Sequence, residues 1–188
     1  MWLMPMKGLS GSGKSTIGRA LSKHLGWPLI DKDDVKDLLD GRLPEAGGLA
    51  YDIMFQIARR QLLQGLNVIC DSPLTGRIAY AHAQAVAIET YADLVLIECI
   101  CSNEALWRQR IDARKTLGLP AHHQIDWDAF QDYRRDSHSQ ASYPIVHPQL
   151  VVDTVRPLHE CLAQIIEWLE QIAASSNKPG TQRKQNST

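Results

Sequence analysis

Short apolar runs alternate with stretches of helical periodicity along most of the chain. The apolar runs have the length of strands. The run at 93–101 is the most continuous, which indicates a strand buried at the centre of a sheet. Strands that alternate with helices are typical of a parallel sheet with helices on both faces. The pattern therefore predicts an α/β fold with strands at 2–6, 28–30, 68–71, 93–101 and 150–153.

The segments between these strands carry apolar side chains at helical spacing. In the stretch at 49–64, we expect Ile53, Ile57 and Leu63 to face the core. Asn103 is the expected N-cap of the helix after 93–101, because its side chain can accept a hydrogen bond from the first helical turn. The predicted helices cover residues 15–25, 33–39, 49–64, 78–91, 104–115 and 158–173.

Pro5 conflicts with the first predicted strand. A proline has no N–H group and cannot donate a hydrogen bond to a neighbouring strand. We therefore expect a bulge or an early end of this strand.

Two segments do not follow the alternation of strands and helices. Residues 116–143 are polar, rich in histidine and weakly periodic, which predicts a mobile lid with one helix near 126–135. Residues 175–188 contain no large apolar side chain and are expected to form a disordered polar tail. The chain is thus predicted to form one domain, residues 1–174, followed by this tail.

The composition excludes several classes of protein. The 188 residues are 44% hydrophobic and 22% charged, with a net charge of −1, which argues against a protein built to bind nucleic acid or an anionic membrane. No apolar run approaches the roughly 20 residues of a membrane span, and no basic region with a following apolar stretch suggests a secretion signal. We expect a cytoplasmic location and a monomer or homodimer.

The four cysteines are too few for a disulfide framework, and their spacing does not fit a zinc site. Cys99 and Cys101 would share one face of a strand, while Cys70 and Cys161 stand alone in the sequence. We expect all four to be reduced, buried thiols.

The strongest chemical signal is a glycine-rich segment between the first predicted strand and the first predicted helix. Its pattern is that of a phosphate-binding P-loop (Walker A), in which backbone N–H groups and a helix N-terminus hold nucleotide phosphates. Lys14 would contact the terminal phosphates, Ser15 would ligate Mg²⁺, and Thr16 would lie near the α-phosphate. The expected nucleotide-binding residues are Gly8, Ser10, Gly11, Ser12, Gly13, Lys14, Ser15 and Thr16.

The nucleotide is expected to be ATP. The sequence has no Asn-Lys-x-Asp motif of the kind that reads guanine. A domain of this length also has little room for the modules of a motor or a transporter, although all of these classes use a P-loop. These points favour a small kinase that uses ATP and Mg²⁺.

Carboxylates follow two of the predicted strands, at the sheet edge where α/β proteins bind ligands. Asp33 is our choice for the general base, which would take the proton of an acceptor hydroxyl. The alternative is that it only stabilises a helix N-terminus. Asp71 ends the strand at 68–71 and could hold Mg²⁺ or orient the acceptor. Lys36 and Arg77 could bind the acceptor or simply face solvent.

Arginines lie on the helix that enters the predicted lid. Arg110 and Arg114 are four residues apart and share one helix face. Such side chains could stack on adenine or stabilise charge on the transferred phosphoryl group, or they could be an exposed basic face. A closing lid would also exclude water from the reactive phosphate.

With these features, the chain resembles predicted P-loop kinases that are often described as AAA-domain ATPases. These are relatives of gluconate kinase, chloramphenicol phosphotransferase, zeta toxin and the polynucleotide 5′-kinase domain. The similarity covers roughly residues 2–170. The resemblance implies a three-layer fold with a five-stranded parallel sheet in the order 2-3-1-4-5, a lid, and Mg-ATP as the phosphoryl donor. It also implies Asp33 as the base and Arg110 or Arg114 as a nucleotide contact.

The sequence thus predicts an ATP-dependent kinase that phosphorylates a hydroxyl group of a small metabolite. Tyr51 lies on the helix beyond the expected base and could line the acceptor pocket. A polynucleotide or nucleotide-sugar kinase is one alternative, although polynucleotide kinases resembling this chain have arginine where Lys36 stands. A nucleotide-dependent regulatory or toxin-like ATPase module is the other alternative.

Overall fold

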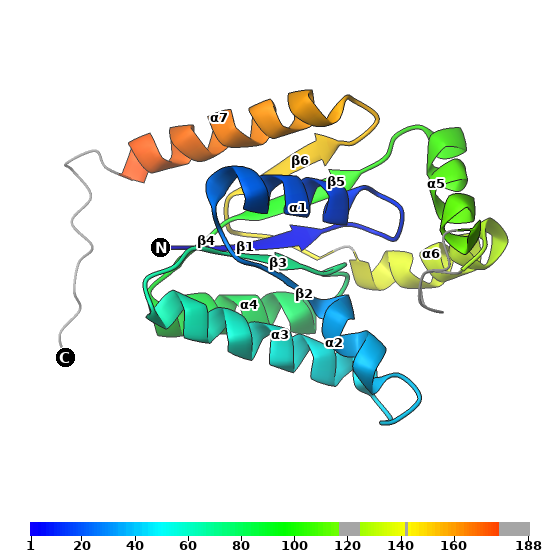
Figure 1. Cartoon of the computed structure of the whole chain (residues 1–188), viewed down its shortest axis with the longest axis horizontal. Coiled ribbons are helices and arrows are strands. Elements are labelled where there is room, and N and C mark those ends of the chain that lie inside the picture. Colours follow the sequence, from blue (N-terminus) through cyan, green and yellow to red (C-terminus); the bar gives the residue numbers. More distant parts are fainter. Residues whose placement is uncertain (117–124, 142, 177–188) are drawn as a thin grey trace.

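A computed structural model describes residues 1–116, 125–141 and 143–176 (Figure 1). The strands form one parallel sheet in the order β2-β3-β1-β5-β6, and β4 also pairs with β1. Counting β4 and β5 as one strand gives the predicted order 2-3-1-4-5. The strands are β1 (Trp2–Lys7), β2 (Leu29–Asp31), β3 (Val68–Asp71), β4 (Asp93–Leu94), β5 (Leu96–Ile100) and β6 (Gln149–Asp153).

Pro5 explains why the predicted strand at 93–101 is divided into β4 and β5. The carbonyl oxygen of Leu3 on β1 accepts a hydrogen bond from the N–H of Val95. Alternate residues of a strand direct their backbone groups to the same neighbouring strand, so Pro5 also faces the segment that contains Val95. Pro5 has no N–H to donate there, and the pairing with β1 is interrupted between Leu94 and Ile97. The register is identical on both sides of the interruption, so the expected bulge or early strand end is wrong.

Helices cover both faces of the sheet (Figure 1). On one face, α1 (Lys14–Leu25) and α7 (Leu158–Ser176) pack in a cluster with Met4, Met6 and Ile97. On the other face, α3 (Ala46–Leu63) and α4 (Arg77–Thr90) pack around Leu3 and Leu96. The short helix α2 (Lys32–Leu39) joins β2 to α3 and packs against α3. This is the predicted three-layer α/β architecture.

The predicted inward face of α3 is wrong. Ile57 is 39% exposed and Leu63 is 58% exposed. The buried face instead contains Ala50, Met54, Phe55, Ala58 and Leu62. Two of these are alanines, which give a weak hydrophobic signal, yet an alanine allows the helix to approach the sheet closely. The large aliphatic residues alone therefore indicated the wrong face.

A separate apolar cluster joins α5 (Glu104–Thr116) to α6 (Trp127–Ala141) beside the end of the sheet (Figure 1). Asn103 accepts a hydrogen bond from the Leu106 N–H at 3.0 Å, which confirms the predicted cap. The helix expected near 126–135 is also confirmed. However, Trp127 and Phe130 are buried against α5, so this part of the expected lid has an apolar face that its polar composition concealed.

Part of the predicted lid, residues 117–124 and 142, lies outside the described residues, as does the predicted tail from residue 177 onward. The four cysteines are described, and all are buried free thiols. Within the described residues, no helix combines the length and apolarity that crossing a membrane requires.

Candidate active site

The phosphate-binding loop connects β1 to α1 and depends on glycine at close approaches. Gly13 has φ +91°, and a Cβ atom there would lie 2.9 Å from Thr154 Oγ1. Gly8 has φ +144°, and its Cβ would lie 2.4 Å from the carbonyl oxygen of Cys99. A side chain at either position would combine an unfavourable backbone conformation with a clash. The loop can therefore hold this path only with glycine at these positions.

Two backbone N–H groups of the loop are used within the protein, whereas those at the start of α1 are available to a ligand. The N–H of Gly8 donates to Pro73 O, and the N–H of Ser12 donates to Leu9 O. Gly13 occupies the N-cap position and has no side chain to cap the helix, so the N–H groups of the first turn have no acceptor among the described residues. Together with the helix dipole, these groups form a binding site for an anion such as phosphate.

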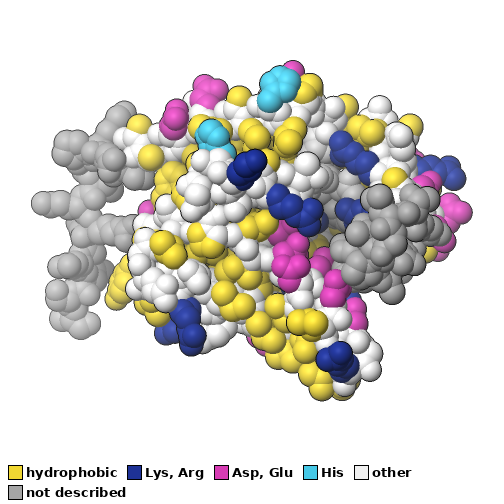
Figure 2. Space-filling view, viewed as in Figure 1, with side chains coloured by type: hydrophobic (Ala, Val, Ile, Leu, Met, Phe, Trp, Pro, Cys, Tyr) yellow, Lys and Arg dark blue, Asp and Glu magenta, His cyan; other side chains and the backbone are white. Residues whose placement is uncertain are grey.

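A pocket of about 290 Å³, here named the transfer pocket, lies beside this loop. Figure 2 shows basic and acidic side chains gathered side by side at this part of the surface, between α1, α2 and α5. The pocket brings together groups from the loop, α2 and α5 that are far apart in sequence. Its polar lining residues are Ser10, Lys14, Ser15, Lys32, Asp33, Lys36, Arg114 and, from α6, Tyr133.

Asp33 is held at the pocket by a residue that the sequence analysis missed. Lys32 Nζ lies 2.7 Å from Asp33 Oδ1, and Lys32 is only 6% exposed. The same ammonium group lies 5.5 Å from the centre of the Tyr51 ring. Lys32 stands in an acidic run, and the sequence held no signal of its burial. The ion pair fixes the position of the Asp33 carboxylate at the pocket.

Asp71 and Asp31 lie next to each other at the carboxyl ends of β3 and β2, where they are register partners. Asp71 is 2% exposed, and neither of its carboxylate oxygens has a hydrogen-bond partner among the described residues. Burial is the main cause that raises the pKa of Asp31 to about 6, and the nearby Asp71 carboxylate raises it further. A buried carboxylate without a donor, close to another carboxylate, fits a divalent cation. Asp31 is the second residue that the sequence analysis did not select.

Arg114 and Arg110 take different positions. Arg114 Nη1 donates to Ser10 Oγ at 2.8 Å, and burial lowers the pKa of its guanidinium while Asp33 and Asp71 oppose that shift. Arg110 instead donates to both Oγ1 and the carbonyl oxygen of Thr154, each at 2.8 Å. Of these two arginines, only Arg114 lines the transfer pocket.

Both arginines line a second cavity of about 520 Å³ on the other side of the loop, here named the outer cavity, which also contains Ser15 and Thr16. Thr154 fixes this wall, because its hydroxyl lies 2.8 Å from the carbonyl oxygen of Ser12 as well as contacting Arg110. Thr154 follows β6, and its contact with the loop spans 142 residues of sequence. No local pattern could have indicated it.

Some predicted residues lie elsewhere. Tyr51 is not among the residues that line the transfer pocket; its hydroxyl accepts a hydrogen bond from the Leu74 N–H at 3.2 Å. Arg77 is exposed at the start of α4 and lines a different hollow with Tyr80. Lys36 reaches the transfer pocket and forms an ion pair with Asp40. The Ser12 hydroxyl lines neither the transfer pocket nor the outer cavity.

Solved structures of kinases share this fold. A candidate kinase from Chloroflexus aurantiacus j-10-fl has a TM-score of 0.72 at 23% identity, over 90% of this chain and 96% of that one. A gluconokinase from Sinorhizobium meliloti 1021 has a TM-score of 0.62 at 18% identity, over 92% and 94%. The APS kinase of Mycobacterium tuberculosis, solved with AMPPNP and APS, has a TM-score of 0.63 at 18% identity, over 89% and 96%. These similarities concern the fold.

The sequence itself matches a family described as an AAA domain over residues 3–136. That range includes the phosphate-binding loop, both carboxylates at the strand ends, and both arginines. No curated protein sequence matches the chain. The family match covers most of the chain and confirms the resemblance seen in the sequence. The chain therefore belongs to this AAA-domain family of P-loop proteins, and its fold is that of the P-loop kinases.

Proposed function

We propose that the protein is an ATP-dependent kinase that transfers the γ-phosphoryl group to a hydroxyl group of a small molecule. The observation that carries this proposal is the composition of the transfer pocket, where Asp33 shares one small space with Lys14 and Arg114. A carboxylate beside the expected site of the terminal phosphate could act as general base and remove the proton of an acceptor hydroxyl. The two cations would stabilise charge on the phosphoryl group during transfer.

In the proposed reaction, the acceptor oxygen attacks the γ-phosphorus, and a new O–P bond forms. The bond between this phosphorus and the bridging oxygen breaks, and its electron pair leaves with ADP. Asp33 takes the hydroxyl proton as a general base. Its ion pair with Lys32 holds the carboxylate in place.

Mg²⁺ would be held by Ser15 and Asp71, with Asp31 as a neighbouring carboxylate, and it would neutralise phosphate charge. The α-phosphate would lie near Thr16, and the nucleoside would occupy the outer cavity beside Arg110. The loop would bind the remaining phosphates through the donors at the start of α1. We further propose, from the net charge and fold, that the protein works in the cytoplasm.

A small acceptor is favoured over the alternatives. The transfer pocket has a volume of about 290 Å³, and its position beside Lys14 leaves room for a small group. The net charge of −1 disfavours a polynucleotide acceptor, and a purely regulatory ATPase has no use for a positioned base. The alternatives differ in what stimulates ATP turnover.

A metabolite-library screen with Mg-ATP tests the proposal, with mass spectrometry to detect a product that has gained one phosphate. We expect at least one hydroxyl compound to be phosphorylated by the wild type and not by Lys14→Ala. A steady ATPase rate that no compound stimulates would instead support the regulatory module. Phosphorylation of an oligonucleotide end would support the polynucleotide kinase.

A further inference from the structure

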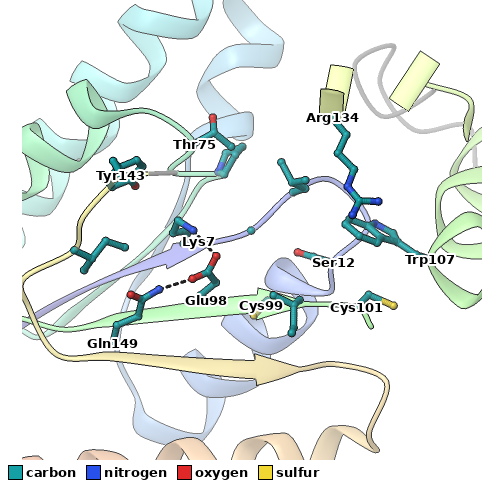
Figure 3. A pocket seen from close by; sticks show the side chains of 15 residues that line it. Lys7, Ser12, Thr75, Glu98, Cys99, Cys101, Trp107, Arg134, Tyr143 and Gln149 are labelled. Carbon is teal, nitrogen blue, oxygen red and sulfur yellow. Dashed lines mark hydrogen bonds and ion pairs between the residues drawn. The ribbon is translucent and has the colours of Figure 1, made fainter. Parts of the chain in front are cut away.

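Figure 3 shows a third cavity, here named the side cavity, which shares part of its lining with the transfer pocket. It has a volume of about 500 Å³, and Leu9 and Pro73 line both spaces. It lies toward α6 and the segment after it, since Arg134 and Tyr143 also contribute to its wall. Of the expected nucleotide-binding residues only Gly8 and Ser12 line it, and neither Lys14 nor Asp33 does. Proton transfer and the contact with the terminal phosphates therefore do not explain its chemistry.

The floor of the side cavity is charged where a hydrophobic core would be expected. Lys7 and Glu98 are register partners on two central strands, and they form an ion pair with side chains only 13% and 22% exposed. Gln149 on β6 donates to the other oxygen of the Glu98 carboxylate (Figure 3). Burying a charged pair costs desolvation free energy that its own attraction often does not recover. A polar floor at this position therefore suggests a ligand.

The floor offers hydrogen-bond donors and acceptors next to each other. Each oxygen of Glu98 accepts one hydrogen bond from the protein, so each keeps capacity for another. The Lys7 ammonium has three N–H groups, of which Glu98 uses one. The charges of Lys7 and Glu98 cancel, which disfavours a strongly charged ligand on the floor. Hydroxyl groups fit best, because each can donate and accept.

A second observation points into the same space. Ser12 is 1% exposed, and its hydroxyl has no hydrogen-bond partner among the described residues. Figure 3 shows this oxygen directed toward the cavity, opposite the pair of Lys7 and Glu98. A buried hydroxyl without a partner is costly, and a ligand hydroxyl would remove that cost. Thr75 also lines the cavity.

The far wall is aromatic. The indole of Trp107 donates its N–H to the carbonyl oxygen of Ser10 at 2.7 Å, so its polar group is already satisfied. Arg134 lies over this ring at 5.1 Å, on the side of the cavity away from Tyr143 (Figure 3). Trp107 is only 8% exposed, so this wall offers a ligand the N–H groups of Arg134 and a small part of the ring.

We propose that the side cavity binds the non-reacting end of the acceptor, and that this end is a neutral, hydroxyl-rich body such as a polyol or a sugar. This inference rests on the proposed kinase function. The hydroxyl to be phosphorylated would lie in the transfer pocket near Asp33, and the chain of further hydroxyls would pass Leu9 and Pro73 to the side cavity. Glu98, Lys7 and Ser12 would then determine acceptor specificity.

The test is calorimetric titration of the full-length protein, saturated with a non-hydrolysable ATP analogue, with glycerol, erythritol, xylitol and glucose. The variant removes both charges at the floor, Lys7→Met with Glu98→Gln, so that no unpaired charge is buried. The matched control is Arg59→Met with Glu89→Gln, which removes an exposed ion pair with an N···O distance of 2.6 Å between α3 and α4. If the floor variant loses its native circular dichroism spectrum, Ser12→Ala replaces it, since the Ser12 hydroxyl has no partner among the described residues, and the same loss of binding is expected.

We expect at least one of the longer polyols or the sugar to bind the wild type and the control equally, and to bind the floor variant about tenfold to a hundredfold more weakly. Equal affinity for the floor variant would overturn the inference, as would the failure of all four probes to bind. Binding is measured without turnover, so the result is independent of the kinase assay. If the wild type phosphorylates no compound in the metabolite screen, the proposed function is contradicted, and the binding result still stands.

Discussion

The donor side and the acceptor side of the candidate site are built in different ways. The donor side is one continuous stretch, residues 8–16, whose shape follows from glycines and from the start of α1. The acceptor side is assembled from α2, the turn after β3, α5 and α6. The first side is fixed mainly by local backbone geometry. The second depends on how distant elements pack.

The two sides also bind through different groups. The donor side presents backbone N–H groups, which have no alternative ionisation state and need no ion pair. The acceptor side presents charged side chains that are already paired, such as Asp33 with Lys32 and Lys36 with Asp40. Substitutions that disturb the donor-side backbone should therefore affect nucleotide binding, whereas the Lys14 side chain, which lines the transfer pocket, should affect catalysis. Those on the acceptor side should affect catalysis and specificity.

The largest expected effect comes from Lys14→Ala. Removing this cation should lower kcat by at least about 10³, because its charge stabilises the transferred phosphoryl group. The fold should persist, which circular dichroism would check, and the exposed Lys23 on the same helix gives a control variant, Lys23→Ala. Near wild-type turnover in Lys14→Ala would contradict the assignment of the donor side.

Asp33→Asn should separate the two sides most clearly. The amide keeps the shape of the side chain but cannot take the proton, so kcat should fall by roughly 10²–10³. The affinity for Mg-ATP, measured by calorimetry, should change little, and added Mg²⁺ should not restore activity. Asp34 is exposed one residue further on, so Asp34→Asn is the control. If Asp33→Asn loses ATP binding outright, Asp33 belongs to the donor side.

Gly13→Ala tests the close approach that fixes the loop. The positive φ should cost about 1–2 kcal/mol, and the clash with Thr154 should add about 1–3 kcal/mol. Gly41→Ala is the control, because Gly41 has φ +74° but nothing within 4 Å of an added Cβ. Urea unfolding should show the larger loss of stability for Gly13→Ala. If Gly13→Ala and Gly41→Ala lower the free energy of unfolding equally, the clash with Thr154 contributes nothing, and the positive φ alone explains the need for glycine at position 13.

Asp71→Asn should raise the Mg²⁺ concentration needed for half-maximal activity by about tenfold, because a carboxylate at the cation site is lost. Excess Mg²⁺ should then restore part of the activity, unlike in Asp33→Asn. A titration of activity against Mg²⁺ at saturating ATP measures this. An unchanged Mg²⁺ requirement with weaker acceptor binding would move Asp71 to the acceptor side.

The smallest effect concerns the pH dependence of stability. The pKa of Asp31 is raised from 3.8 to about 6 in the folded protein, so the folded state holds this proton more tightly than the unfolded state does. The free energy of unfolding should therefore fall as pH rises from about 4 to about 6. The fall should be less than about 2 kcal/mol, since Asp31 is half-buried and solvent screens its charge. Asp31→Asn should remove this slope in urea unfolding at several pH values, and Asp34→Asn should retain it.

Most of the fold was predictable, and the departures have physical causes. Strand β3 falls at its predicted residues, and the other elements differ at their ends by a few residues. The run at 93–101 was divided because Pro5, on a neighbouring strand, cannot donate a hydrogen bond. The face of α3 was misjudged because Ala50 and Ala58 pack closely without a strong hydrophobic signal.

The sequence by itself determined the position of the phosphate-binding loop, the succession of strands and helices along the chain, and the placement of carboxylates at strand ends. These depend on backbone conformation and on periodicity, which neighbouring residues control. Only the tertiary structure decided the burial of Lys32, the anchoring of the loop by Thr154, and the pairing of Lys7 with Glu98. The pairing joins residues that are 91 positions apart, and the Thr154 contact joins residues that are 142 positions apart. Their energies depend on packing and local polarity, which exist only once the sheet has formed.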